Sequence, residues 1–240
     1  MIYVSSDLHG YPLSRFQKLL SRAGFSDSDY LFVLGDVIDR NGDGGIELLQ
    51  WMSLQPNVEL LLGNHEAMLL ACSFLFEEIT DSSIDSLTDA RMGMLATWIS
   101  NGAEPTLKAL RALHGKAPDA VEDILDFLRG CPLYDRVTAG GREFLLVHSG
   151  LGGFDRKRRL SDYTPDELLW HRPEPEERYF NGTVTILGHT PTDYYGCPGR
   201  AYRALTWIDI DTGAGQGGAP MLLRLDDMRE FYMDQEVRGL

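Results

Sequence analysis

The chain has 240 residues, of which 43% are hydrophobic, and this is enough for one large domain with a substantial buried core. Its 22 basic and 36 acidic side chains give a net charge of -14, which disfavours binding to nucleic acid and to anionic membranes. No apolar run reaches the length of a membrane span, and the first residues carry no basic leader, so we expect a cytoplasmic protein.

Five short, apolar and β-branched runs along the chain predict strands. They cover residues 2–4, 30–34, 58–62, 143–147 and 183–187. A helix is predicted over 12–23, where apolar residues share one helical face and Gly24 follows the end. Between roughly 66 and 130 the pattern is almost wholly helical, which indicates a helical insertion between two α/β halves. No repeat or long linker divides the chain, so we predict one domain over 1–240.

Two later helices carry start signals in the sequence. Asp119 followed by Glu122 is typical of a capping box, in which the two residues satisfy each other's backbone amides. Thr164, Pro165 and Glu167 give the same signal again. We therefore predict helix starts at Asp119 and at Thr164.

A residue that can bind a metal follows each predicted strand. These residues are Asp7 and His9, Asp36, Asn64, His148 and His189. Loops that follow neighbouring strands converge at one edge of an α/β fold, so we expect these side chains to meet. A single buried Asp or His at a strand end is more often a structural polar group, but six of them at five successive strand ends favour a metal centre. The cysteines have no paired spacing, which argues against a thiolate site.

Five motifs that contain these residues resemble the signature of the calcineurin-like metallophosphoesterases, and more narrowly their phosphoprotein phosphatase branch. They are DLHG at 7–10, GDVIDR at 35–40, GNHE at 63–66, VHSG at 147–150 and GHT at 188–190. The resemblance extends through NGAEPTLKAL at 101–110, CPLYDRV at 131–137, LLWHR at 168–172 and IDTG at 210–213. It covers most of the chain, and the compact bacterial and phage members are the most similar. The resemblance implies an α/β sandwich of two mixed β-sheets flanked by helices.

The family resemblance also implies a centre of two divalent metal ions. Asp7, His9 and Asp36 would hold the first ion, and Asp36, Asn64, His148 and His189 would hold the second. Manganese is the metal that we expect, with iron or zinc as alternatives, because the donors are carboxylate, amide and imidazole. Two such ions would lower the pKa of a shared water, so the resemblance implies that the nucleophile would be hydroxide and not a side chain. The ions would also supply the positive potential that an acidic chain needs to bind a phosphate.

Four further residues match functional positions of the family. His65 resembles the general acid that protonates the leaving alkoxide, and we expect it to pair with Asp39. Arg40 and Arg172 match positions that grip phosphate oxygens. Each residue also has a structural alternative: His65 could support a metal ligand, Asp39 could pair with Arg40, and the arginines could be solvated surface residues.

One position departs from the protein phosphatase pattern. Protein phosphatases usually carry arginine immediately before GNHE, where this chain has Leu62, and leucine here resembles the symmetrical diadenosine tetraphosphatases. Our first expectation is a serine/threonine protein phosphatase-like enzyme that hydrolyses phosphomonoesters, with a phosphorylated protein or a small phosphoester as substrate. The alternatives are a symmetrical diadenosine tetraphosphate hydrolase and a catalytically silent module that senses metal or phosphate.

Overall fold

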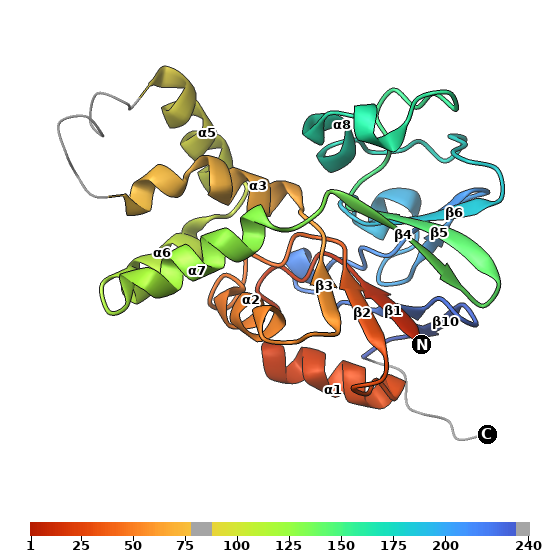
Figure 1. The fold of residues 1–240 in the computed structure, drawn as a ribbon, viewed down its shortest axis with the longest axis horizontal. Helices are drawn as coiled ribbons and strands as arrows, with labels where there is room; N and C mark the ends of the chain where they lie inside the picture. The colour runs from red at the N-terminus through yellow and green to blue at the C-terminus, as the bar shows by residue number, and fades with distance from the viewer. Residues whose placement is uncertain (78–87, 234–240) are drawn as a thin grey trace.

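The protein is described by a computed structural model that covers residues 1–77 and 88–233. Its strands form two five-stranded sheets, with helices packed around them (Figure 1). Each sheet contains both parallel and antiparallel pairs of strands. The predicted sandwich of two mixed sheets flanked by helices is therefore confirmed.

The first sheet, called sheet A below, has the strand order β10-β9-β1-β2-β3. Its strands are β1 (Ile2–Ser5), β2 (Tyr30–Val33), β3 (Val58–Leu60), β9 (Leu222–Arg224) and β10 (Arg229–Phe231). β1, β2 and β3 run parallel, so all three end at the same edge of the sheet. β9 and β10 are antiparallel additions on the other side of β1.

The second sheet, called sheet B, has the order β4-β5-β6-β8-β7. Its strands are β4 (Tyr134–Ala139), β5 (Arg142–Val147), β6 (Thr183–Leu187), β7 (Tyr202–Arg203) and β8 (Trp207–Asp209). The parallel strands β5, β6 and β8 lie between the antiparallel edge strands β4 and β7. The sequence predicted β5 and β6 but missed β4, β7 and β8 of this sheet and β9 and β10 of sheet A. β7 to β10 have only two or three residues each, too few to show a periodic pattern, and β4 is only half-buried.

Helices fill the remaining space outside the sheets. They are α1 (Leu13–Ala23), α2 (Ile46–Ser53), α3 (Asn64–Ala71), α5 (Asp89–Ser100), α6 (Glu104–His114), α7 (Pro118–Arg129) and α8 (Pro165–Leu169), with 3-10 turns η1 (Ser73–Phe76), η2 (Leu160–Asp162), η3 (Thr192–Tyr195) and η4 (Ala214–Gln216). The predicted insertion over 66–130 is helical where it is described, and its residues 78–87 lie outside the described part. None of the described helices has the length and apolar character that a membrane crossing requires.

The two predicted capping boxes had different outcomes. α7 begins at Pro118 after Ala117, and no side chain caps it, so the helix start predicted at Asp119 was wrong. Proline sets this start instead, because its fixed φ suits the first helical position and its missing amide hydrogen is not needed there. Thr164 caps α8 as predicted, and Glu167 bonds back to the Thr164 backbone amide at 2.8 Å.

Apolar layers on both faces hold each sheet in place. Val4 and Phe32 point from sheet A into the layer between the sheets, where they join Phe144 of sheet B. The alternate residues Tyr3 and Leu31 point the other way and pack against the helices outside sheet A. Close packing on both faces fixes the strand ends, and with them the loops that follow.

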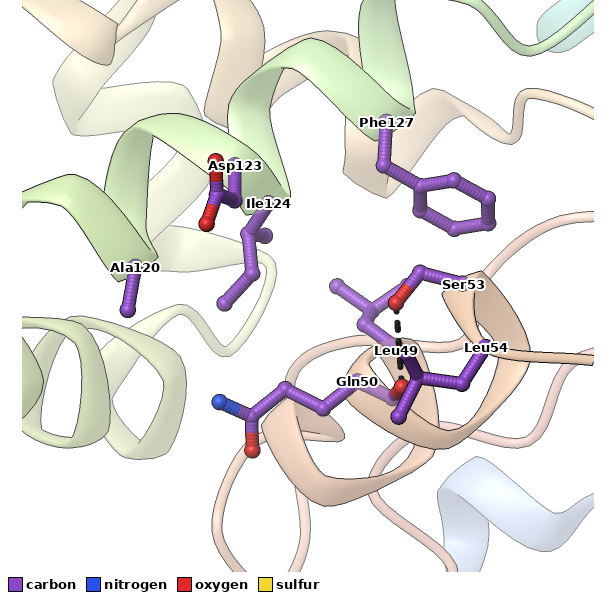
Figure 2. Close-up of a pocket in the computed structure, with 8 residues that line it drawn as sticks. All are labelled: Leu49, Gln50, Ser53, Leu54, Ala120, Asp123, Ile124 and Phe127. Atoms are coloured by element: carbon purple, nitrogen blue, oxygen red, sulfur yellow. Dashed lines mark hydrogen bonds between the residues drawn. The ribbon is translucent and has the colours of Figure 1, made fainter.

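The helical insertion packs on α2 and leaves a groove between α2 and α7 (Figure 2). The groove has a volume of about 340 Å³, with apolar walls that include Leu49, Ile124 and Phe127. Gln50 and Asp123 add polar groups to its lining. None of the residues that line this groove belongs to the predicted metal set, so the groove is not the candidate active site.

Candidate metal centre

The loops that follow β1, β2, β3, β5 and β6 bring the six predicted ligands together. Sheet A supplies Asp7, His9, Asp36 and Asn64, and sheet B supplies His148 and His189. All six side chains are buried. One buried cluster of oxygen and nitrogen donors, called the metal cluster below, therefore forms where the ends of the two sheets meet.

Asp36 stands at the middle of the metal cluster, and its two carboxylate oxygens face different neighbours. Oδ2 lies 3.5 Å from His9 Nε2, which is itself 4.0 Å from Asp7 Oδ1. Oδ1 lies 3.4 Å from His148 Nε2. This arrangement suits a carboxylate that binds one cation through each oxygen.

Asn64 completes the second half of the metal cluster. Its Oδ1 lies 2.8 Å from His148 Nε2 and 2.9 Å from His189 Nδ1. In the same half, Asp36, His148 and His189 offer ligand atoms that all lie within 4.8 Å of one another. The backbone amide of His189 donates to Asp7 Oδ2 at 3.0 Å, which joins this half to the first.

Backbone carbonyls fix the orientation of two imidazoles. His9 Nδ1 donates to Ile38 O at 2.9 Å, and His148 Nδ1 donates to Leu34 O at 2.6 Å. A proton on Nδ1 leaves the lone pair of Nε2 facing the metal cluster, which is the form that a metal ion binds. Burial lowers the pKa of His9 and of His189 to about 3, so both rings are neutral at neutral pH.

The pKa values of the two carboxyl groups of the metal cluster are shifted in opposite directions. Burial and the neighbouring charge of Asp36 raise the pKa of Asp7 to about 8. Burial also opposes the ionisation of Asp36, but the imidazoles of His148 and His65 act against it and the pKa of Asp36 is lowered. Two buried carboxylates this close repel each other, and bound cations would relieve that repulsion. The donors present therefore fit divalent ions such as manganese, iron or zinc.

The loops around the metal cluster hold the backbone in the left-handed region. Seven described residues other than glycine have a positive φ, and six of them are predicted site residues: Asp7, His9, Asp36, Asp39, Arg40 and His189. Each such conformation costs roughly 1–3 kcal/mol and persists only where the surrounding structure enforces it. Gly188 shows how tightly the loops pack, because a Cβ at this position would overlap the side chains of Asp7 and Ser6.

Asp39 and His65 form the pair that the sequence predicted. His65 Nδ1 lies 2.5 Å from Asp39 Oδ2, and its Nε2 faces the metal cluster 3.7 Å from Asp36 Oδ2. Asp39 also accepts hydrogen bonds from Trp98 Nε1 at 2.8 Å and from Thr106 Oγ1 at 2.5 Å. All of these side chains are buried. Among the described residues, two of the three side-chain donors to the Asp39 carboxylate thus come from the helical insertion, on α5 and α6.

The two predicted arginines flank different halves of the metal cluster. Arg40 is half-buried, and its Nη2 lies 3.3 Å from His65 Nε2. Arg172 is exposed, and its charge acts together with burial to lower the pKa of His189.

Glu66 is a site residue to which the sequence analysis gave no role. Its carboxylate accepts the backbone amides of Asp36 at 2.8 Å, Val37 at 2.8 Å and Gly63 at 3.0 Å, and it is fully buried. These bonds tie the loop after β2 to the start of α3 and so hold Asp36 in place. A glutamate at the third position of a helix is the signal that could have identified this role.

A second pair of buried carboxyl groups, Asp209 and Asp211, lies beside the metal cluster. Over the described residues, Asp209 Oδ2 has no hydrogen-bonding partner. Burial, followed by the charge of Asp211, raises the pKa of Asp209 well above its ordinary value. A carboxyl group with a raised pKa in the folded state favours folding below its unfolded pKa of about 4, and this stabilisation is lost as the pH rises.

We therefore expect Asp209→Asn to stabilise the protein at pH 8. The free energy of unfolding should rise by about 1–3 kcal/mol, because the uncharged asparagine removes the desolvation cost of a buried ionisable carboxyl, and it should change little near pH 4. Urea unfolding of the protein after metal removal with a chelator, at both pH values, measures the change. The control is Asp193→Asn, which alters an exposed carboxylate. An Asp209→Asn protein that is less stable than its parent at pH 8 would contradict this account.

Comparison with known proteins identifies the family that this geometry fits. The family model of the calcineurin-like phosphoesterases matches residues 1–212. The chain belongs to this family. The metallophosphoesterase resemblance that the five motifs predicted is thereby confirmed, and with it a phosphoesterase family that uses divalent metals.

Relatives of this calcineurin-like phosphoesterase include bacterial proteins named symmetrical bis(5'-nucleosyl)-tetraphosphatase. The protein from Acidovorax sp. (strain JS42) is 31% identical over 196 residues, which cover 79% of this chain and 57% of the relative. The chain thus spans a little over half the length of that relative. The protein from Chromobacterium violaceum is 37% identical over 275 residues, covering 97% of this chain and 94% of the relative.

Solved structures share the fold of this phosphoesterase. A candidate diadenosine tetraphosphatase superposes with a TM-score of 0.59, covering 98% of this chain and 94% of its own. The two sequences are 16% identical, so this likeness concerns the fold alone.

Proposed function

We propose that this phosphoesterase hydrolyses dinucleoside tetraphosphates symmetrically, at the central phosphoanhydride, to give two nucleoside diphosphates. The observation that carries the proposal is the position of Asp36, which faces ligand atoms on both sides and so offers two adjoining cation sites. The names of the relatives support the substrate class. Leu62 before the GNHE motif supports it as well, because the arginine of the protein phosphatases is missing there.

We assign the ligands of the two cations as the sequence predicted. Asp7, His9 and Asp36 would hold one ion, and Asp36, Asn64, His148 and His189 would hold the other. When bound, two divalent ions, manganese by preference, lower the pKa of water and offset the charge of the phosphoryl group. We also propose that residues 1–240 act as one metallophosphoesterase domain.

The protein's own side chains would orient the substrate and supply a proton. Water adds its oxygen to one phosphorus atom, and the bridging oxygen leaves with the other nucleoside diphosphate. His65 Nε2 would protonate that leaving oxygen, while Asp39 holds the ring through Nδ1 and stabilises its positive charge. Arg40 and Arg172 would bind phosphate oxygens on the two sides of the metal cluster.

A substrate panel tests the proposal. We expect the purified, manganese-reconstituted protein to hydrolyse diadenosine tetraphosphate with a kcat/KM at least about tenfold above that for a phosphoserine peptide, because a site built for two nucleotides discriminates through contacts that a peptide lacks. Chromatography of the products should show ADP alone. Formation of AMP and ATP would contradict symmetrical cleavage.

A serine/threonine protein phosphatase is the second candidate function. The observation that favours it is the pair of motifs GDVIDR at 35–40 and GNHE at 63–66, which resemble that branch and place Arg40 beside His65. Preference for the phosphoserine peptide in the same panel would replace the first candidate with this one. Two bound metals without turnover of any phosphoester would instead favour a silent sensing module.

A further inference from the structure

Trp170 is an exposed indole at the edge of the metal cluster. It follows the end of α8, where its backbone amide donates to Asp166 O at 3.2 Å. Its ring meets the imidazole of His189 edge to face, with the centroids 6.0 Å apart and the planes at 85°. Trp170 is 40% exposed, whereas His189 is 9% exposed. The indole therefore lies between a candidate metal ligand and solvent.

The exposure of Trp170 differs from that of the tryptophans used for packing. Trp98 and Trp207 are fully buried, and each donates its indole hydrogen, to Asp39 at 2.8 Å and to Glu177 O at 3.3 Å. Packing and hydrogen bonding therefore account for both of these rings. An aromatic ring that is left partly open beside a site for phosphate chemistry is instead suited to contact with the substrate.

The neighbouring charge indicates which substrate group would reach Trp170. Arg172 is exposed and follows Trp170 by two residues, so its guanidinium would draw phosphate oxygens to the side of the metal cluster where the indole meets His189. A group attached to that phosphate would then extend past His189 towards the indole. In a dinucleoside tetraphosphate, two phosphates and a ribose separate the central bridging oxygen from each base. A nucleobase has a flat π face that stacks on indole, and a phosphoserine has none.

We propose that Trp170 is the stacking platform for one nucleobase of the substrate, an inference that rests on the proposed function. The metal cluster and the arginines would recognise the phosphates, and Trp170 would recognise the nucleoside. Stacking of this kind tolerates different bases, because every base has a π face. The site would therefore select nucleoside polyphosphates over base-free polyphosphates.

Removal of the indole tests this inference kinetically. Trp170→Ala should lower kcat/KM for diadenosine tetraphosphate by about 5-fold to 150-fold, mainly through KM, and Trp170→Phe should keep most of the activity. Hydrolysis of inorganic tetraphosphate, which has the same phosphate chain without nucleosides, should stay within about twofold of the wild type. The control is Tyr30→Ala, which removes an exposed aromatic side chain at the start of β2, the end of that strand away from the metal cluster. An equal loss on both substrates would overturn the inference.

Binding of ADP provides a second readout that does not depend on turnover. Titration with ADP should quench the tryptophan fluorescence of the metal-loaded protein, and Trp170→Phe should abolish that quenching. Quenching by ADP in a protein that cannot cleave the dinucleotide would overturn the proposed function while supporting the platform. Normal cleavage with unchanged kinetics and quenching in the Trp170 variants would overturn the platform alone.

Discussion

Asp36→Asn is expected to lower hydrolysis of diadenosine tetraphosphate and of p-nitrophenyl phosphate by at least about 10³-fold. The asparagine keeps the size of the side chain, but it has no negative charge for two cations to share. Its amide hydrogens would also face the Nε2 atom of His9 or of His148, where the carboxylate oxygens now lie 3.5 Å and 3.4 Å away. Steady-state kinetics measure the loss, and elemental analysis after reconstitution should find fewer than two metal ions.

The control for this experiment is Asp27→Asn, which changes an exposed carboxylate in the loop before β2, at the end of that strand away from Asp36. Circular dichroism should show that both variants keep the fold of the parent. An Asp36→Asn protein with two bound metals and full activity would refute the bridging role that we propose for Asp36.

His65→Asn is expected to lower kcat for phenyl phosphate by about 10²–10⁴-fold, the usual contribution of a positioned general acid. Phenol is a poor leaving group with a pKa near 10, so its oxygen needs a proton as the bond breaks. The loss on p-nitrophenyl phosphate should be far smaller, because that leaving group departs without a proton. The comparison of the two substrates therefore reports on proton donation and not on folding.

Metal content separates the two roles that the geometry allows for His65. Its ligand atom lies within 4.8 Å of those of His9 and Asp36, so it could be a ligand in its own right. We expect His65→Asn to bind two metals, as the parent would. Loss of one metal would show that His65 is a ligand and would contradict the role as general acid.

The hydrogen bonds that the insertion donates to Asp39 should also affect kcat for phenyl phosphate, but to a smaller extent than His65 does. Thr106→Val removes a donor to Asp39, and the loss of one hydrogen bond to a charged group should lower kcat on phenyl phosphate by about tenfold. Thr106→Ser keeps the hydroxyl and should retain activity. Equal losses on phenyl and p-nitrophenyl phosphate would mean that Thr106 supports only the fold.

The sequence predicted those parts of the fold whose signals are local. β5 and β6 are long enough, at six and five residues, to show a strand pattern, and polar residues after the strands marked their ends. β7, with two residues, gave no pattern that could be read. The bonds from Trp98 and Thr106 to Asp39 span 59 and 67 residues, and no short-range pattern encodes them.

The family could be predicted from the sequence more readily than the substrate could. The five motifs contain the residues of the metal cluster, which the family shares whatever its members hydrolyse. We propose that specificity depends instead on residues around that cluster, such as Leu62 and Trp170, which stand outside the ligand set. The expectation of a protein phosphatase gave more weight to the motifs than to Leu62, whereas the names of the relatives favour the tetraphosphatase alternative.

The supply of metal ligands from both sheets has a consequence for how this protein matures. Asp36 follows a strand of sheet A, and His148 and His189 follow strands of sheet B, while sheet A also includes β9 and β10 from the C-terminal part of the chain. A chain in which only one of the two sheets has formed holds an incomplete set of donors for two ions. Under the proposed ligand assignment, uptake of two ions would follow the docking of the two sheets, and the bound ions would then link them.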